Sequence, residues 1–300
     1  MMAAFTLAHL SDPHLAPLPA PSLRELIGKR ATGYLHWTRT RHKIHRREVL
    51  DALVADLRAQ RPDHIAVTGD VVNIALAAEF APARTWLQSV GTPEHVTIVP
   101  GNHDAYARAT QHSFAEIWRD YLRGDDALTA DPVRFPFVRR RGPLALIGVS
   151  SAVPTRPFMA TGWLGRAQRE ALDGILSRLS AEPVFRVLLV HHPLRSDKGS
   201  RHKRLTDSDE LLILLKRHGV ELILHGHDHV HSTMWFDGPR GGIPAIGAPS
   251  ASAIAHGQYP AAAYNLFSIG RDGERWRCEQ TVRGVGDDMP IHELRRERLY

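Results

Sequence analysis

The sequence predicts an α/β fold in which strands and helices alternate along the chain. Short apolar runs rich in Val, Ile and Leu recur between longer segments whose apolar residues are spaced as on one face of a helix. Strands joined by helices usually pair in parallel, so part of the sheet is expected to be parallel. With 300 residues, 43% of them hydrophobic and 23% charged, the chain has a globular composition and can bury a sizeable core.

The predicted strands are apolar runs that stop at turn residues, and the predicted helices have amphipathic spacing. The first run stops at Ser-Asp-Pro, and the first long helix carries Val49, Leu50 and Leu53 on one face. Strands are expected at residues 5–10, 64–68, 95–99, 144–150, 185–190 and 220–225, and helices at 46–60, 77–89, 114–122, 166–179 and 207–218. From about residue 231 the pattern is strand-like to about residue 282, which predicts a second sheet packed nearby.

Composition excludes several classes of protein. The single cysteine, Cys278, excludes an intramolecular disulfide and a cysteine-rich zinc module. The chain lacks both an apolar stretch of about 18 residues and the charged start of a secretory signal, so a cytoplasmic protein is expected. The net charge of +6 is compatible with an anionic substrate. No linker divides the chain, so residues 1–300 are expected to form one domain.

The residues that can carry chemistry follow five of the predicted strands. They are Asp12 with His14, Gly69-Asp70, Gly101-Asn102-His103-Asp104, His191-His192 and Gly226-His227-Asp228-His229. Because ligands bind beyond the carboxyl ends of strands in open α/β sheets, these side chains are expected at one edge. Asp, Asn and His suit Mn²⁺, Fe or Zn²⁺ better than Ca²⁺. Seven such donors exceed the needs of one ion, whereas two ions that share a carboxylate use them all.

In this order, the motifs make the chain resemble the calcineurin-like metallophosphoesterases. The intact PGNHD at residues 100–104 and GHDH at 226–229 carry the resemblance, which spans roughly residues 5 to 250. HLSDPHL, TGDVVN, PGNHD and HHP are most similar to bacterial class III phosphodiesterases of the cyclic-nucleotide and glycerophosphodiester type. The resemblance implies a four-layer αββα sandwich of two mixed β-sheets with flanking helices.

The resemblance also implies roles for individual residues. Two divalent ions (Mn²⁺, Fe²⁺/Fe³⁺ or Zn²⁺) would be held by Asp12, His14 and His229 at the first site, by Asn102, His191 and His227 at the second, and by Asp70 as a bridge. His103 matches the family's histidine that contacts the substrate phosphate without binding a metal.

Elementary chemistry supports the same reaction. Two divalent ions about 3.5–4 Å apart can clamp a phosphoryl oxygen and lower the pKa of a bridging water. The resulting hydroxide is expected to attack phosphorus in line with the leaving oxygen, while the ions neutralise the charge that develops. The leaving alkoxide needs a proton or a nearby positive charge, and His103 is the catalytic residue expected to supply it.

Neighbours of the expected ligands have less specific roles. His192 is expected to line the site or to bond the backbone rather than to bind a metal. Asp104 and Asp228 are expected either to orient ligand imidazoles or to serve as turn residues. Asn73, in the TGDVVN segment, is grouped with them as a residue that supports the site or contacts the substrate.

A basic and aromatic insertion at about residues 17–45 separates the first strand from the first long helix. Residues 21–50 hold eight Lys or Arg and two Glu, with Tyr34, Leu35 and Trp37 among them. A typical strand–helix connection has about 2–6 residues, so we expect a lid whose Arg39 and Arg41 contact a phosphorylated substrate. The alternatives are a solvated helix and a membrane contact. A second basic segment, residues 195–204, is expected to be a loop near the site or a solvated loop.

The sequence therefore predicts metal-dependent hydrolysis of a phosphodiester bond in a small substrate, such as a cyclic nucleotide or a glycerophosphodiester. One alternative is a pyrophosphatase on a nucleotide- or lipid-linked diphosphate, with the insertion against an apolar tail or a membrane surface. A nuclease needs a continuous basic groove, and nucleic acid is disfavoured as a partner. A non-catalytic scaffold is disfavoured because every expected ligand is present. The sequence makes no prediction of the oligomeric state.

Overall fold

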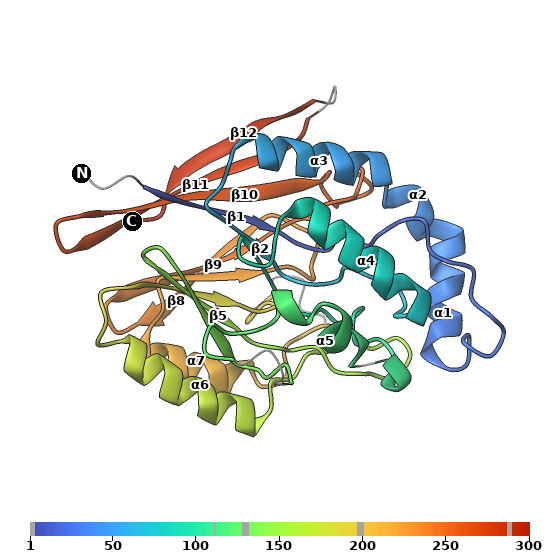
Figure 1. Cartoon of the computed structure of the whole chain (residues 1–300), viewed down its shortest axis with the longest axis horizontal. Coiled ribbons are helices and arrows are strands. Elements are labelled where there is room, and N and C mark those ends of the chain that lie inside the picture. The colour runs from blue at the N-terminus through green and yellow to red at the C-terminus, as the bar shows by residue number, and fades with distance from the viewer. Residues whose placement is uncertain (1–3, 111, 128–131, 197–200, 287–289) are drawn as a thin grey trace.

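Two six-stranded mixed sheets lie face to face in the computed structural model, which describes residues 4–110, 112–127, 132–196, 201–286 and 290–300. The strand order is β12-β11-β10-β1-β2-β3 in the first sheet and β4-β5-β6-β7-β9-β8 in the second. Helices cover the outer faces of both sheets, so the layers run helix, sheet, sheet, helix (Figure 1). The predicted αββα sandwich is confirmed.

The first sheet combines strands from both ends of the chain. Strands β1 (Phe5–Leu10), β2 (His64–Val67) and β3 (Val96–Ile98) are parallel. Strands β10 (Ala263–Asp272), β11 (Arg275–Val285) and β12 (Ile291–Arg298) continue the sheet antiparallel from β1.

Two expectations about the C-terminal strands are therefore wrong. They do not form a sheet of their own: the earlier strands of this run, at residues 232–238 and 241–247, belong to the second sheet, whereas the later ones extend the first sheet. Strand β1 is buried and needs a hydrogen-bonded neighbour on each edge, which β10 supplies. The C-terminal strands also reach Arg298 instead of ending near residue 282, since the charged side chains of β12 are mostly exposed and conceal its strand pattern.

The second sheet has a parallel centre and antiparallel edges. Strands β5 (Leu144–Gly148), β6 (Phe185–Leu189), β7 (Leu222–His225) and β9 (Gly241–Gly247) are parallel. The edges are β4 (Phe137–Arg141) and β8 (Ser232–Gly238). Strand β4 was not predicted because three of its five residues are arginines. One of them, Arg139, is buried and donates to the carbonyls of Pro93 and Val96 at 2.6 and 2.8 Å.

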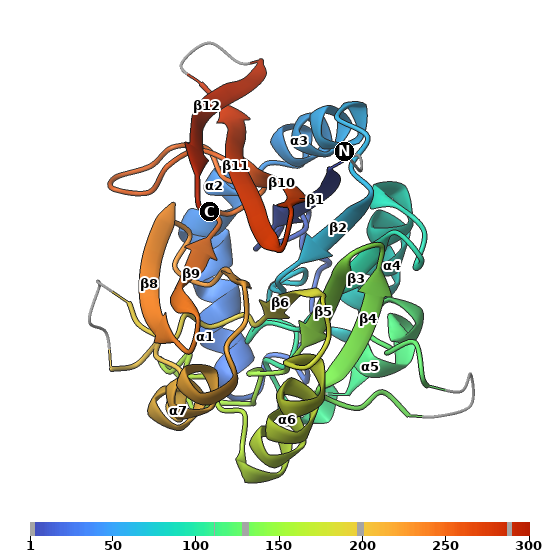
Figure 2. The ribbon, with the colours of Figure 1, turned by 90° about the vertical axis from the view of Figure 1, so that its left-hand side faces the viewer.

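The helices follow the predicted order with one shortened member. Helices α3 (Arg47–Ala59) and α4 (Ala77–Val90) cover the first sheet, and α6 (Arg166–Leu179) and α7 (Ser208–His218) cover the second (Figure 2). The helix expected at 114–122 is α5 (Ser113–Ile117) followed by a 3₁₀ turn. None of the helices in the described ranges has the length and apolar character needed to cross a membrane.

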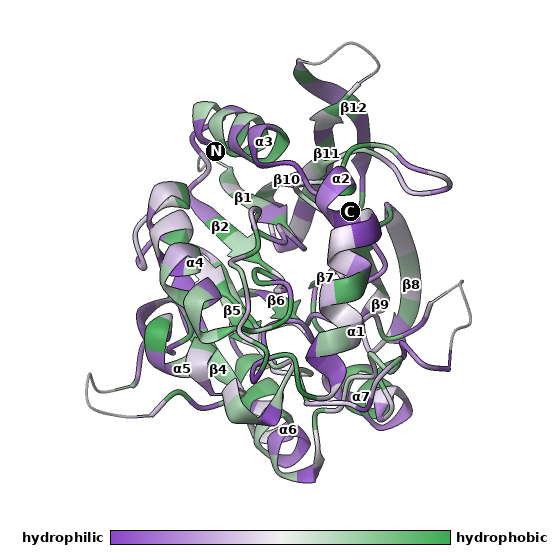
Figure 3. Cartoon of the chain, turned by 90° about the vertical axis from the view of Figure 1, so that its right-hand side faces the viewer, coloured by the Kyte–Doolittle hydropathy of each residue, from purple (hydrophilic) through white to green (hydrophobic). Residues whose placement is uncertain are grey.

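The insertion is partly helical and lies at one end of the sandwich. It forms α1 (Lys29–His36), a π-helical turn (Trp37–Arg41) and the short α2 (His42–Ile44). In Figure 1 these elements stand at the right-hand end, toward which β1 runs, and in Figure 3 they cross in front of the strand ends. The alternative of a solvated helix holds for only part of the insertion, because Trp37 and His45 are buried.

The central strands are continuous apolar runs because both of their faces are buried. In β5, Ile147 belongs to the core that contains Leu172 of α6 and Leu215 of α7, whereas Leu146 belongs to the core between the sheets, with Phe267 of β10. The hydropathy colouring of Figure 3 shows the same distribution, with green on the inner strands and purple on outer helix turns. This packing fixes where each strand ends, and hence where the residues after it lie.

Candidate metal centre

The five motifs lie just beyond the carboxyl ends of β1, β2, β3, β6 and β7. Among the described residues, their side chains and that of His45 form three groups in which the candidate donor atoms lie within 4.8 Å of one another. These groups are His14, His45 and His229; His14, Asp70 and His103; and Asp70, His191 and His227. The structure therefore brings the predicted ligands together and adds one residue, His45, from the insertion.

One cluster contains four buried donors. Asn102 Oδ1 lies 3.1 Å from His191 Nε2 and 2.9 Å from His227 Nδ1. His191 Nε2 lies 3.3 Å from both His227 Nδ1 and Asp70 Oδ2. The four side chains are at most 8% exposed, so one small ion would be enclosed by protein donors.

A second cluster lies on the other side of Asp70. His229 Nε2 lies 3.1 Å from Asp12 Oδ1 and 3.3 Å from His14 Nε2. His14 Nε2 lies 3.8 Å from Asp12 Oδ1 and 3.9 Å from Asp70 Oδ2. Asp70 is shared, because its Oδ1 accepts the backbone N–H of His103 at 2.7 Å and its Oδ2 faces His14 and His191.

Hydrogen bonds to the backbone aim two of the imidazoles. The Nδ1–H groups of His14 and His191 lie 3.3 Å from the carbonyl of Val72 and 2.6 Å from that of Thr68. A carbonyl can only accept, so each ring carries its proton on Nδ1 and presents Nε2 to the cluster. Metal-binding histidines are oriented in this way in proteins.

The donor set fits a pair of cations. Two buried carboxylates, Asp12 and Asp70, face imidazole nitrogens and an amide oxygen, all of which bind metals. His227 Nε2 is buried and has no hydrogen-bond partner among the described residues. Burial alone would lower the pKa of His191, but the carboxylate of Asp70 raises it to about 10, so the carboxylate favours positive charge at this place.

Backbone strain accompanies the cluster. Asp12, His14, Asp70, His227 and His229 all have positive φ, between 39° and 72°. Such conformations cost of order 1–3 kcal/mol each for residues other than Gly and persist where the surrounding structure imposes them. At the neighbouring Gly226, a Cβ atom would lie 2.3 Å from Asp12 Oδ2, so the close approach requires glycine.

Asp104 organises the turns that carry the ligands. Its Oδ2 accepts the backbone N–H groups of Asp70 and Gly101, both at 2.8 Å, and its Oδ1 accepts those of Val71 and Val72 at 2.9 and 3.1 Å. It therefore joins the turn after β2 to the turn after β3, rather than orienting an imidazole.

Replacing Asp104 with Asn is expected to lower the free energy of unfolding by about 3 kcal/mol. Either orientation of the amide places its NH₂ against two buried N–H donors, and each buried donor without a partner costs about 1–3 kcal/mol. Urea unfolding of the metal-free protein measures the loss. The exposed Asp126→Asn is the matched control, and equal midpoints for the two variants would contradict the assigned role.

The other predicted neighbours hold positions rather than metals. The Nδ1 of His192 accepts from Ser151 Oγ at 2.7 Å, and its Nε2–H donates to the Ala160 carbonyl at 3.1 Å. Asp228 accepts from Ser196 Oγ at 2.6 Å. The Asn73 side-chain amide donates to the Leu15 carbonyl at 2.7 Å, and the Asn73 backbone carbonyl accepts the Nδ1–H of His103.

The two arginines of the insertion occupy different environments. Arg41 is half-buried, and its Nη1 lies 3.3 Å from His103 Nε2 and 3.4 Å from His103 Nδ1, whereas Arg39 is exposed. Burial, reinforced by the charge of Arg41, lowers the pKa of His103 to about 3 despite the nearby Asp70.

Of the basic segment 195–204, residues 197–200 lie outside the described residues. Its Arg195 donates to Ser208 Oγ at 2.8 Å.

His45 is the site residue that sequence reasoning missed. It is 3% exposed and its ring centroid lies 4.7 Å from that of His14. In the sequence it stands among five cationic residues and follows no strand, so no motif marks it. The only available signal was its place at the end of an insertion whose two ends are anchored near the site.

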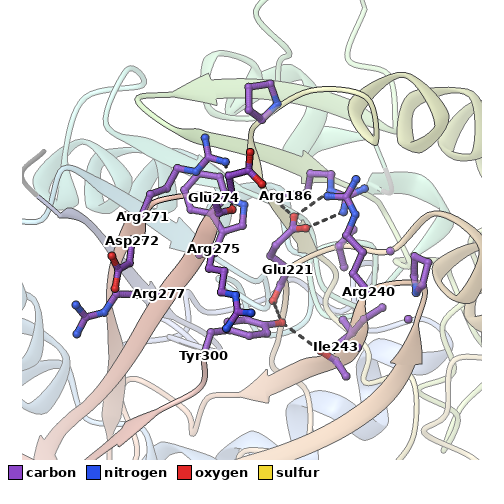
Figure 4. Close-up of a pocket in the computed structure, with 18 of the residues that line it drawn as sticks. Arg186, Glu221, Arg240, Ile243, Arg271, Asp272, Glu274, Arg275, Arg277 and Tyr300 are labelled. Carbon is purple, nitrogen blue, oxygen red and sulfur yellow. Dashed lines mark hydrogen bonds and ion pairs between the residues drawn. The ribbon is translucent and has the colours of Figure 1, made fainter. Parts of the chain in front are cut away.

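A large cavity lies away from this cluster. Its volume is about 620 Å³, and its lining comes from the segments that precede β6 and β7 and from the β8–β9 and β10–β11 turns. These are the amino ends of β6 and β7, opposite the motifs. Figure 4 shows Arg186 paired with Glu221, at 2.7 and 2.9 Å, beside Tyr300. Glu221 neutralises the buried Arg186, so this arginine offers no free positive charge to an anionic substrate. The candidate metal donors lie at the opposite ends of these strands.

Known proteins resemble the chain in sequence. A family model for the calcineurin-like phosphoesterases matches residues 5–231. A probable cyclic nucleotide phosphodiesterase of Rhodococcus erythropolis is 29% identical over 238 residues, covering 77% of this chain and 67% of that protein. A glycerophosphodiester phosphodiesterase of Enterobacter lignolyticus is 27% identical over 204 residues, covering 65% and 68%.

A solved structure shares the fold. A dimetal phosphatase from Danio rerio superposes with a TM-score of 0.60 at 14% identity, and the match covers 97% of this chain and 99% of that one. The family match extends over most of the chain and includes every motif at the strand ends. The protein thus belongs to the calcineurin-like phosphoesterase family and is a metal-dependent phosphoester hydrolase.

Proposed function

We propose that the protein hydrolyses the phosphodiester bond of a small substrate at a centre of two divalent ions. The observation that carries the proposal is Asp70 Oδ2, which lies 3.9 Å from His14 Nε2 and 3.3 Å from His191 Nε2. A single carboxylate oxygen between two donor clusters is suited to bridging two ions. The remaining ligands would be Asp12, His14 and His229 at the first site and Asn102, His191 and His227 at the second.

The residues of the chain hold this arrangement rigid. When bound, two divalent ions supply Lewis acidity toward the phosphoryl oxygens and a water of lowered pKa as the nucleophile. Asp104 fixes the turn that carries Asp70, and the carbonyls of Val72 and Thr68 fix the rings of His14 and His191. A site built on fixed groups loses little free energy to reorganisation during the reaction.

Arg41 is the group that we assign to the substrate's negative charge. The Nδ1–H of His103 is bound to the Asn73 carbonyl, so its Nε2 is free to accept from Arg41. His103 is then neutral, and the guanidinium beside it stays charged at neutral pH. Arg41 would supply the positive charge that the phosphate or the leaving oxygen needs, and His103 would position it.

Arg41→Ala is expected to lower kcat/KM for the diester by about 10–100-fold, because a hydrogen bond to a charged group contributes about 1.5–3 kcal/mol. Arg39→Ala, two residues away on the same turn, removes the same charge from an exposed position and is expected to change kcat/KM less than twofold. Steady-state kinetics on both variants measures the difference. Equal losses would show that only the net charge of the insertion matters.

The substrate class rests on the named relatives, which are called cyclic nucleotide and glycerophosphodiester phosphodiesterases. The test is a substrate panel on protein stripped by a chelator and reloaded with Mn²⁺, Fe²⁺ or Zn²⁺. We expect hydrolysis of cyclic nucleotides, glycerophosphodiesters or bis(p-nitrophenyl) phosphate to return with the metal and to exceed that of the corresponding monoesters. Full activity without metal, or a preference for monoesters, would refute the proposal.

A specific observation favours a second candidate, a lipid-linked diphosphate. Leu23 and Ile27 of the insertion are 88% and 78% exposed, and Phe158 is 85% exposed. Lys29 Nζ donates to Thr155 Oγ1 at 2.6 Å and to the Met159 carbonyl at 2.9 Å, which ties the insertion to the loop around Phe158. Exposed apolar side chains of this kind could contact an acyl chain. Including a lipid-linked diphosphate in the panel distinguishes the two candidates.

A further inference from the structure

The insertion carries a histidine into the first donor cluster. The candidate donor atoms of His45, His14 and His229 lie within 4.8 Å of one another. Neighbouring nitrogens bound to one zinc ion at about 2.0–2.1 Å lie about 3–3.5 Å apart. A shift of the His45 ring by at most about 2 Å would therefore bring all three onto one ion.

Hydrogen bonds orient the His45 ring as they orient the other candidate ligands. His45 Nδ1 lies 2.9 Å from Ser252 Oγ, and Ser250 Oγ donates to the Asp12 carbonyl at 2.7 Å. The two hydroxyls are 3.4 Å apart. If each hydroxyl donates toward Asp12, the chain of bonds runs from His45 Nδ1–H through Ser252 and Ser250 to that carbonyl. Nε2 is then left with a free lone pair.

The backbone around His45 is held in place before any ligand binds. The N–H of His45 donates to the Arg41 carbonyl at 2.9 Å, and the flanking N–H of Arg46 donates to the Ser252 carbonyl at 2.8 Å. On the preceding side, Ile254 N–H donates to the Ile44 carbonyl at 3.0 Å. His45 is thus fixed to the segment that follows β9, although it belongs to the insertion.

We propose that His45 is a further ligand of the first metal ion, beside Asp12, His14, Asp70 and His229. The inference rests on the proposed two-ion function and extends it, because it makes the insertion part of the metal site rather than a cover alone. A fifth protein donor leaves fewer positions for exchangeable ligands at the first site than at the second. The first ion is then expected to be the more tightly bound of the two.

The test is a Co²⁺ titration of chelator-stripped protein, followed by visible absorption and metal analysis. Wild type is expected to bind two ions with unequal affinity. His45→Ala and His45→Phe are expected to weaken the tighter site at least about tenfold and to alter its absorption bands, since loss of even an outer partner of a ligand costs about 10–100-fold. Phe preserves packing against Trp37, whose ring plane is within 5° of parallel to that of His45. His36→Ala, an exposed histidine on α1, is the control and should match wild type.

The possible results separate the inference from the function on which it rests. If wild type binds two ions and hydrolyses the diester while His45→Phe keeps both affinities and the same bands, the inference is wrong and the function stands. Weakened binding in His45→Ala that Phe restores would assign His45 to packing and also overturn the inference. If wild type binds fewer than two ions, the proposed function itself fails.

Discussion

Asp70→Asn is expected to remove both ions from the centre and to lower phosphodiester hydrolysis by more than about 10³-fold. The amide keeps the size of the side chain and can still accept the backbone N–H of His103, so the turn should survive. The Asn side chain lacks the negative charge that Asp70 presents to His14 and His191. Without the ions, both the nucleophile and the neutralisation of the phosphate charge are lost.

Metal analysis of the purified variant and kinetics at saturating metal measure this effect. Asp272→Asn, an exposed aspartate beside the cavity at the other end of the sheets, is the matched control and should retain metal and activity. An Asp70→Asn variant that keeps two ions and loses less than tenfold in rate would exclude a bridging role.

His103→Ala is expected to lower kcat by about 10–100-fold while both ions stay bound. The variant removes the acceptor that holds Arg41 beside the centre, so the loss of activity should not exceed that of Arg41→Ala. Metal content, kcat and the folded fraction by circular dichroism are measured on the same preparation. Loss of metal would instead make His103 a ligand.

His103→Gln distinguishes positioning of Arg41 from proton transfer. A glutamine oxygen can accept a hydrogen bond from Arg41, but a side-chain amide cannot act as a general acid or base at neutral pH. We expect His103→Gln to recover part of the activity lost in His103→Ala. We also expect the double variant, with both Arg41 and His103 replaced by Ala, to be little less active than His103→Ala alone. If His103→Gln is as inactive as His103→Ala, and if the effects of Arg41→Ala and His103→Ala add fully in the double variant, His103 would be assigned to proton transfer.

The sequence identifies those parts of the site that depend on local pattern. A strand that ends in a turn places the next residues at the sheet edge whatever the rest of the chain does, so the position of Asp12, Asp70 and His191 at that edge could be predicted from the pattern. Their roles as individual ligands were implied by the family resemblance. Asp104 could be found but not interpreted, because its role depends on how two turns approach each other. The apolar runs of β5 and β6 predicted their burial for the same local reason.

Features that depend on distant contacts could not be predicted. Strand β10 pairs with β1 across more than 250 residues, and nothing near either strand specifies that partner. Buried Arg139 conceals β4 because its charge is satisfied by carbonyls from other segments. His45 reaches the cluster only because residues 250–254 fix the end of the insertion.

The central claim is that two ions share Asp70. The most direct measurement is anomalous scattering from crystals of the metal-loaded protein, collected at the absorption edge of the metal supplied. We predict two anomalous peaks about 3.5–4 Å apart, with Asp70 Oδ2 within about 2.0–2.2 Å of both if the metal is zinc. A single peak, or two peaks with Asp70 directed away from one of them, would contradict the account.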